Sequence, residues 1–159
     1  MNSPLSHFNR DGKAEMVDVS QKINTARQAK ASGFIAMRPD VLELVKQGHA
    51  AKGDVLGVAR ISAIQGVKRT SDLIPLCHPL PIQHIAVQFD CRDKPSGVHC
   101  QVSVTTIGKT GVEMEALTGV QIALLTIYDM LKAAQKDMVI TNVQLEEKTG
   151  GKSGPFVRA

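Results

Sequence analysis

The sequence predicts an α+β fold in which an antiparallel sheet carries its helices on one face. Two long helical patterns, residues 54–69 and 108–136, are apolar on most sides, as is typical of buried helices. Two strand patterns lie between them, one more precedes the first helix, and another follows the second. This β-α-β-β-α-β order is that of ferredoxin-like folds. The 159 residues suit a single domain, residues 1–159, with its own core.

The N-terminal part of the chain contains an arm, a strand and a short helix. Residues 1–16 are polar and rich in turn residues, so we expect a flexible arm or one that clasps a partner. Residues 16–19 are predicted as an edge strand and residues 27–37 as the first main strand. A short helix over residues 41–46 follows, opened by a proline and ended by Gly48.

The first long helix begins at Asp54, a good N-cap, and runs to about Arg69. Its small residues allow close packing; these are Gly57, Ala59, Ala63 and Gly66. The connection over residues 70–81 contains three prolines, so we expect it to be rigid and to lack regular structure.

Residues 82–92 and 98–107 alternate between apolar and polar side chains, and the sequence DKPSG between them is a turn signal. We therefore predict a β-hairpin. Its symmetry places Cys91 opposite Cys100, both facing the core. Because the chain has three cysteines and no CxxC pair, we expect free thiols, with a disulfide between these two as the lesser alternative.

The longest helical pattern, residues 108–136, carries charges within an apolar run; these are Glu113, Glu115, Asp129, Lys132 and Lys136. Because burial of an unpaired charge is costly, we expect them to reach solvent at the helix ends or to line a site. Asp129 and Lys132 lie at i and i+3. They form either an exposed ion pair or a partly buried acid and base with shifted pKa values.

Glu115 and Asp129 are 14 residues apart, which is close to four turns and about 21 Å along the helix axis. One small reacting centre cannot touch both, so either the ligand is long or two subunits contribute. Two helices that are apolar on most sides also exceed what one sheet face can cover, which predicts an oligomer. A last strand over residues 138–148 precedes a glycine-rich, irregular tail, residues 149–159.

The composition favours some partners and argues against others. The net charge of +4 weakly favours anionic partners. With only 3% aromatic residues the chain lacks a stacking platform for nucleic acid, and a phosphorylated small molecule fits better. We see no membrane-spanning run and no signal peptide near the N-terminus, so we expect a cytoplasmic protein without membrane partners.

Two fragments, Gly108-Lys109-Thr110 and Gly151-Lys152-Ser153, resemble part of a phosphate-binding loop. The full motif needs a glycine five residues earlier, where Ser103 and Glu146 stand, so a P-loop nucleotidase is excluded. What remains is a glycine-flanked loop before a helix N-terminus, which favours anion binding and ordinary capping equally.

Cys77-His78 lies in the proline-braced connection, a setting that favours a fixed reactive side chain over a purely structural histidine. Lys52 precedes a helix N-cap, from which its side chain could reach a site. Taken alone, this lysine is better explained as a solvated residue beside the cap. The histidines and Cys77 lack metal-ligand spacing, so we predict no metal site.

Three longer motifs carry a more specific signal: LIPLCHPL (residues 73–80), KTGVEMEALTG (109–119) and LTIYDMLKAAQKDMVI (125–140). Three shorter ones, MVDVS (16–20), KGDV (52–55) and TGGKSG (149–154), extend the signal over nearly the whole chain. Together they resemble cyclic pyranopterin monophosphate synthase, the molybdenum cofactor biosynthesis protein C family.

The resemblance implies a ferredoxin-like lyase that forms a homohexamer, a trimer of dimers with its site at a subunit interface. It would convert 3′,8-cyclo-7,8-dihydroguanosine 5′-triphosphate into cyclic pyranopterin monophosphate and pyrophosphate. An upstream radical S-adenosylmethionine enzyme would make that substrate from GTP, and no redox cofactor is needed. The alternative is a ferredoxin-like sensor that binds a nucleotide at its subunit interface without turnover.

The resemblance also assigns residues. Asp129 would be the catalytic acid or base, with Lys52 and Lys132 beside it. The residues along the substrate would be Leu76, Cys77, His78, Met114 and Glu115, with Glu113, Arg27, Lys68 and Lys148 as weaker candidates. Residues 48–51 are less polar than in the family, so we assign His49 no role.

Overall fold

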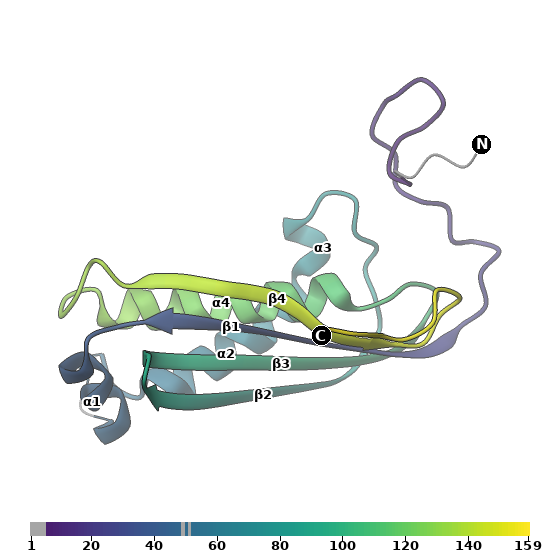
Figure 1. Cartoon of the computed structure of the whole chain (residues 1–159). Coiled ribbons are helices and arrows are strands. Elements are labelled where there is room, and N and C mark those ends of the chain that lie inside the picture. The colour runs from purple at the N-terminus through teal and green to yellow at the C-terminus, as the bar shows by residue number, and fades with distance from the viewer. Residues whose placement is uncertain (1–5, 49, 51) are drawn as a thin grey trace.

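The computed structural model describes residues 6–48, 50 and 52–159 (Figure 1). Its strands are β1 (Thr25–Ala36), β2 (Ile82–Asp93), β3 (Ser96–Gly108), β4 (Val139–Thr149) and β5 (Phe156–Val157). Its helices are α1 (Pro39–Gln47), α2 (Val55–Lys68), α3 (Thr70–Leu73) and α4 (Glu113–Leu131).

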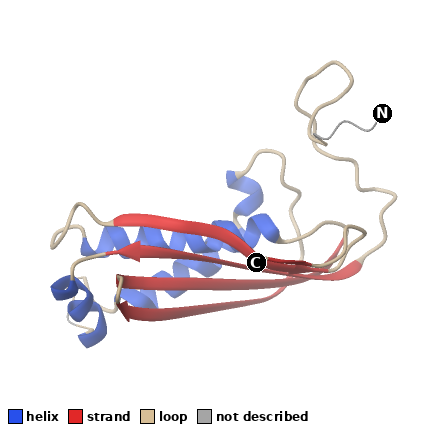
Figure 2. Cartoon of the chain, viewed as in Figure 1, coloured by secondary structure: helices blue, strands red, loops and turns tan. Residues whose placement is uncertain are grey.

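The strands form one antiparallel sheet in the order β2-β3-β1-β4-β5. The long helices α2 and α4 cover one face of this sheet, and α1 lies at the end where β2 turns into β3 (Figures 1 and 2). The element order and the one-sided covering confirm the predicted α+β, ferredoxin-like fold.

The core lies between the helices and the sheet and is built from aliphatic and small side chains. Every second residue of β3 from Val98 to Val104 is fully buried there, as strand periodicity requires. On β1 the core face carries alanines and Gly33, where an added Cβ would lie 2.8 Å from Leu124 Cδ1. A chain with few aromatic residues thus fills its core by bringing backbones close together.

The two long helices approach each other through glycines. A Cβ on Gly66 would lie 2.9 Å from Ile122 Cγ1, and one on Gly119 would lie 2.8 Å from Val67 Cγ2. This confirms the predicted role of the small residues in α2 at Gly66. Gly57 serves differently, because its N–H donates to Asp54 Oδ1 at 2.9 Å and completes the N-cap.

Helix α4 is long and apolar enough to cross a membrane by length and composition, contrary to the expectation from sequence. However, 56% of its most apolar stretch is buried inside the fold. There the helix packs against α2, β1 and β3. The same composition is typical of the central helix of a globular core. On its outer side and on α2, exposed apolar residues remain, which confirms the predicted surplus of apolar surface; these are Val58, Ile61, Met114 and Leu125.

Several predicted element boundaries were wrong. Residues 16–19 belong to no strand. The edge strand beside β4 is instead β5, formed from the tail that we expected to be irregular. The connection after α2 begins with the short helix α3, since its prolines start only at Pro75 and Thr70 Oγ1 can still donate toward Gly66 O (3.1 Å). Helix α4 is shorter than predicted at both ends.

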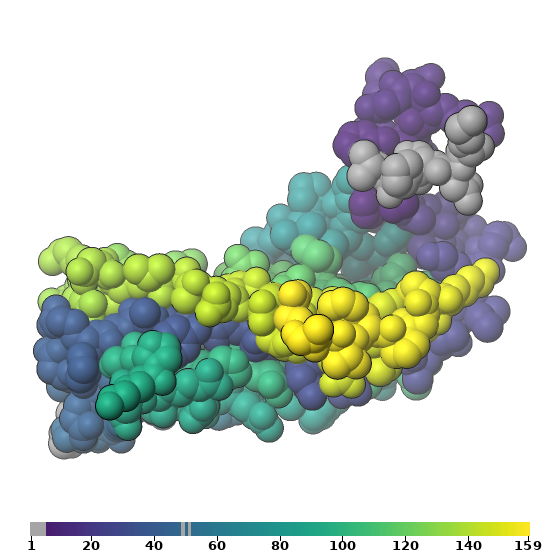
Figure 3. All heavy atoms as spheres, viewed as in Figure 1, coloured from purple at the N-terminus to yellow at the C-terminus, as the bar shows by residue number. Residues whose placement is uncertain are grey.

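The hairpin turn is tighter than predicted, with Asp93 paired to Ser96. This register places Cys91 opposite Val98 and Cys100 opposite Phe89, so the predicted cysteine pairing was wrong. All three cysteines are free thiols, and both hairpin cysteines face the core as predicted. Residues 6–16 of the predicted arm project from the body of the chain (Figures 1 and 3); residues 1–5 lie outside the described part.

We predict that Gly119→Ala lowers the free energy of unfolding by about 1–3 kcal/mol, although alanine is favoured over glycine in helices by about 1 kcal/mol. The reason is that the new methyl would meet Val67 Cγ2 at 2.8 Å and Val102 Cγ1 at 3.1 Å. Chemical denaturation followed by circular dichroism measures the change. Gln121→Ala, on the exposed side of the same helix, is the control and should stay within about 0.5 kcal/mol of wild type. An equal or greater stability for Gly119→Ala would contradict the packing described here.

Candidate active site

A cavity of about 450 Å³ lies at the N-terminal end of α4. The proline-rich connection and the start of the helix supply one part of its lining, Leu76, Cys77, His78, Leu80, Thr110, Gly111, Glu113, Met114 and Glu115. The N-terminal segment supplies the rest, Ser6, His7, Val17, Val19 and Lys22. A smaller cavity of about 200 Å³ shares His78 and Glu115 and adds Lys68. The structure thus brings together seven of the predicted substrate-binding residues.

Glu115 is the buried carboxyl of this cavity, with only 4% of its surface exposed. Burial raises its pKa to about 7, and the neighbouring charge of Glu113 acts in the same direction. Near neutral pH the carboxyl therefore changes between a hydrogen-bond donor and an acceptor. Burial also raises the pKa of the Cys77 thiol, which keeps it protonated. The cavity is suited to hydrogen bonding with the polar edge of a heterocycle.

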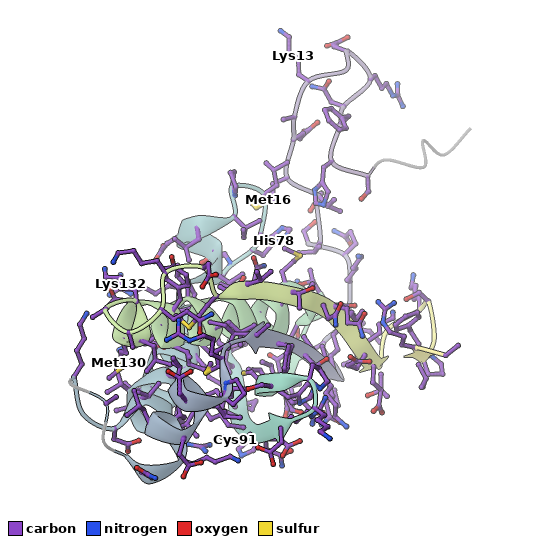
Figure 4. The ribbon with its side chains drawn as sticks, turned by 60° about the vertical axis from the view of Figure 1, so that its left-hand side comes forward. Lys13, Met16, His78, Cys91, Met130 and Lys132 are labelled. Carbon is purple, nitrogen blue, oxygen red and sulfur yellow. The ribbon has the colours of Figure 1, made fainter. Side chains whose placement is uncertain are left out.

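A second cluster lies at the C-terminal end of α4. Asp129 Oδ1 is 2.7 Å from Lys132 Nζ, and Asp129 Oδ2 is 3.3 Å from Lys52 Nζ. Lys52 also donates to the backbone carbonyl of Asp129 at 3.1 Å, so the loop before α2 is tied to the end of α4. The three predicted catalytic residues therefore form one contiguous group; Lys132 is labelled in Figure 4.

In the single chain this group is exposed, which is the first of the two alternatives that the sequence leaves open. In the chain alone, 55% of the Asp129 side chain and 53% of the Lys132 side chain are accessible to solvent, because the neighbouring Met130 and Leu131 take the buried side of the last turn. The two lysines lower the pKa of Asp129, and Asp129 raises the pKa of Lys132. The single chain therefore shows the exposed ion pair and not the partly buried acid and base, and Asp129 and Lys132 each hold the other in its charged form.

The third group surrounds Arg27 in a cavity of about 650 Å³, whose lining is Gln21, Lys22, Ile23, Thr25, Arg27, Gly151, Lys152 and Ser153. Arg27 donates from Nε to Gly108 O and from Nη2 to Lys109 O, each at 3.1 Å. Lys148 donates to Ser153, which places it beside this cavity. The two glycine-lysine fragments that fail as phosphate loops thus meet around one guanidinium.

The geometry around Arg27 bears on where an anion can bind. Gly151 has a φ of +83°, and a Cβ there would lie 2.3 Å from an Arg27 nitrogen, so only glycine fits this crossing. The first turn of α4 carries Glu113 and Glu115, which already match the positive end of the helix dipole. Anion binding is therefore favoured at Arg27 rather than at the helix N-terminus.

The sequence reasoning missed part of the lining. It assigned no role to Val17, Val19, Lys22 or Lys152, although all four line a cavity. The motifs MVDVS and TGGKSG, which contain three of them, were the available signal. Asp129 lines neither of the two cavities described above that contain Glu115, in agreement with the separation of the two residues along the helix. His49 lies outside the described residues.

A comparison with models of protein families matches residues 16–151 to the model described as the MoaC family. The matched region begins at the MVDVS motif and ends within the TGGKSG motif. It includes every site residue predicted from the sequence, from Arg27 to Lys148, whereas Lys152 and Ser153 of the Arg27 cavity lie just beyond its end.

The raised pKa of Glu115 predicts a pH-dependent stability. Its pKa rises from 4.5 to about 7 on folding, so the stabilisation from its neutral form is complete below the unfolded value and is lost as the pH rises through 7. Relative to wild type, Glu115→Gln should gain roughly 2–3 kcal/mol in free energy of unfolding between about pH 5 and about pH 8. Denaturant titrations at fixed protein concentration measure this. Parallel profiles for the two proteins would show that Glu115 is not a buried, titrating carboxyl.

Proposed function

Because the chain belongs to the MoaC family, and therefore has a role in molybdenum cofactor biosynthesis, we propose that it is the cyclic pyranopterin monophosphate synthase. The proposed substrate is 3′,8-cyclo-7,8-dihydroguanosine 5′-triphosphate, supplied by an upstream radical S-adenosylmethionine enzyme. The reaction rearranges the ring system through several proton transfers. A ribose oxygen then attacks the α-phosphorus, which forms the cyclic phosphate and breaks the bond to the departing pyrophosphate. This makes the protein a phosphorus–oxygen lyase.

The observation that carries the proposal is the adjacency of two unlike cavities. One contains the buried carboxyl of Glu115 with His78, and the other contains Arg27 and Lys152. Lys22 lines both cavities. A ligand with a polar heterocycle at one end and a triphosphate at the other matches this arrangement in both size and charge.

The lysine–aspartate group at the other end of α4 supplies the acid and base chemistry. Its exposure in the single chain supports an assembly in which a second subunit covers Lys52, Asp129 and Lys132. Removal of water lowers the pKa of a lysine, and a lysine near a phosphate also neutralises its charge. The proposed assembly is a cytoplasmic homohexamer, a trimer of dimers, and the exposed apolar residues of α2 and α4 are consistent with burial between subunits.

We predict that Asp129→Asn lowers the rate of pyrophosphate release from the proposed substrate by roughly 10²–10⁴-fold, the range for loss of a general acid or base. The matched control is Asp72→Asn, which makes the same chemical change in another exposed i,i+3 ion pair, with Arg69. It should turn over like wild type.

Two outcomes would overturn the proposal. Equal rates of pyrophosphate release for Asp129→Asn and wild type would show that Asp129 is not a catalytic acid or base. A wild-type protein that binds the substrate tightly but releases no pyrophosphate would instead be the nucleotide sensor that the sequence leaves as the alternative.

A further inference from the structure

The segment from Val17 to Lys22 contributes Val17, Val19 and Lys22 to the lining of the Glu115 cavity, and we call residues 17–22 the strap. Val17 and Val19 are half-buried and line the cavity, whereas Asp18 and Ser20 between them are exposed. The strap therefore presents alternate apolar side chains inward, as a strand does, although it pairs with no strand. In Figure 4, Met16 at its start lies on the same side of the molecule as His78.

Residues 16–24 belong to no helix or strand, so the position of the strap depends on a few specific contacts. Lys109 Nζ, from the loop between β3 and α4, donates to the Ser20 carbonyl at 2.9 Å. The Ser20 N–H donates to Asp18 Oδ1 at 2.8 Å, and the Lys22 N–H donates to the Val19 carbonyl at 3.0 Å. These bonds form a compact turn that Lys109 ties to the body of the fold.

The same contacts also lower the pKa of Asp18 in the strap. The hydrogen bonds from Ser20 lower the pKa of Asp18, and the positive charge of Lys109 acts in the same direction. Asp18 therefore stays ionised and keeps the turn closed at neutral pH. Lys109 thus holds the strap by a bond to its backbone and by attraction to its carboxylate.

The strap ends where the two cavities meet, because Lys22 lines both. Its two valines face the cavity of Met114 and Glu115, where their methyl groups provide an apolar wall for a flat ring. A ring bound there is enclosed between the strap and the start of α4, and water is displaced from its face.

We propose that Val17 and Val19 are specificity-determining residues for the ring of the substrate, and that Lys109 is the positioning residue that holds them in place. This inference rests on the proposed function for its substrate. It assigns a role to the MVDVS motif, which the chemistry at Asp129 and its lysines leaves without one.

The first test needs no turnover. Trypsin cleaves after lysine, so the rate of cleavage between Lys22 and Ile23 in the intact, ligand-free oligomer reports how firmly the strap is held. We expect Lys109→Met to raise this rate at least several-fold, since an untethered segment opens more often, and Lys109→Arg to restore the wild-type rate. Lys46→Met is the control, because it also removes one exposed ion-pairing lysine, the partner of Asp93. Cleavage of Lys109→Met at the wild-type rate would overturn the positioning role.

The second test uses the double variant V17A/V19A, which leaves every charge unchanged. We expect KM for the proposed substrate to rise roughly tenfold, as loss of apolar contact predicts, with kcat changed much less. Wild-type kinetics for this variant would overturn the specificity role. Failure of the proposed function can be distinguished from failure of the specificity role. In the first case the wild-type protein itself would release no pyrophosphate, and the proteolysis result would still report on the strap.

Discussion

The close packing of α4 against α2 and β1 determines where the candidate site residues of α4 itself lie. Gly119 packs against Val67 of α2, and Val120 and Leu124 of α4 pack against Gly33 of β1. Because backbones approach this closely, the middle of α4 is buried on most sides and cannot hold an unpaired charge without a large cost in free energy. Charged side chains are therefore confined to its two ends, where the Glu115 cavity and the lysine–aspartate group are found.

The two ends differ in their electrostatics, and the difference suits different tasks. Burial raises the pKa of Glu115 to about 7, so this carboxyl can hold a proton for hydrogen bonding to a ring. Two lysines lower the pKa of Asp129, which remains ionised and holds them in place. In the proposed function, recognition of the ring thus belongs to one end and proton transfer to the other. About four helical turns separate the two ends, so a site that uses both needs either a long ligand or a second subunit.

Much of the fold followed from periodicity, because long apolar patterns leave few alternatives. The helices around Gly66 and Gly119 and the hairpin strands were predicted on that basis. The errors arose where a local contact determines the register or the end of an element. In the hairpin, a two-residue turn sets the register and separates Cys91 from Cys100. At the site, motif resemblance grouped the residues, but the exposure of Asp129 depends on which side of the last turn it occupies. The strap was missed because it has no regular structure and its position depends on a contact with Lys109, distant in sequence.

In the assembly that we propose, each complete site combines the N-terminal end of α4 from one subunit with the C-terminal end from another. Mixed oligomers of Glu115→Ala and Asp129→Asn, each of which we expect to release almost no pyrophosphate alone, distinguish this arrangement from a site within one chain. If the ends come from different subunits, a mixed dimer has one site with both defects and one intact site. Equal, random mixing should then restore about one quarter of wild-type pyrophosphate release. Mixed oligomers no more active than the two variants measured separately would contradict the claim and would place both ends in the same chain's site.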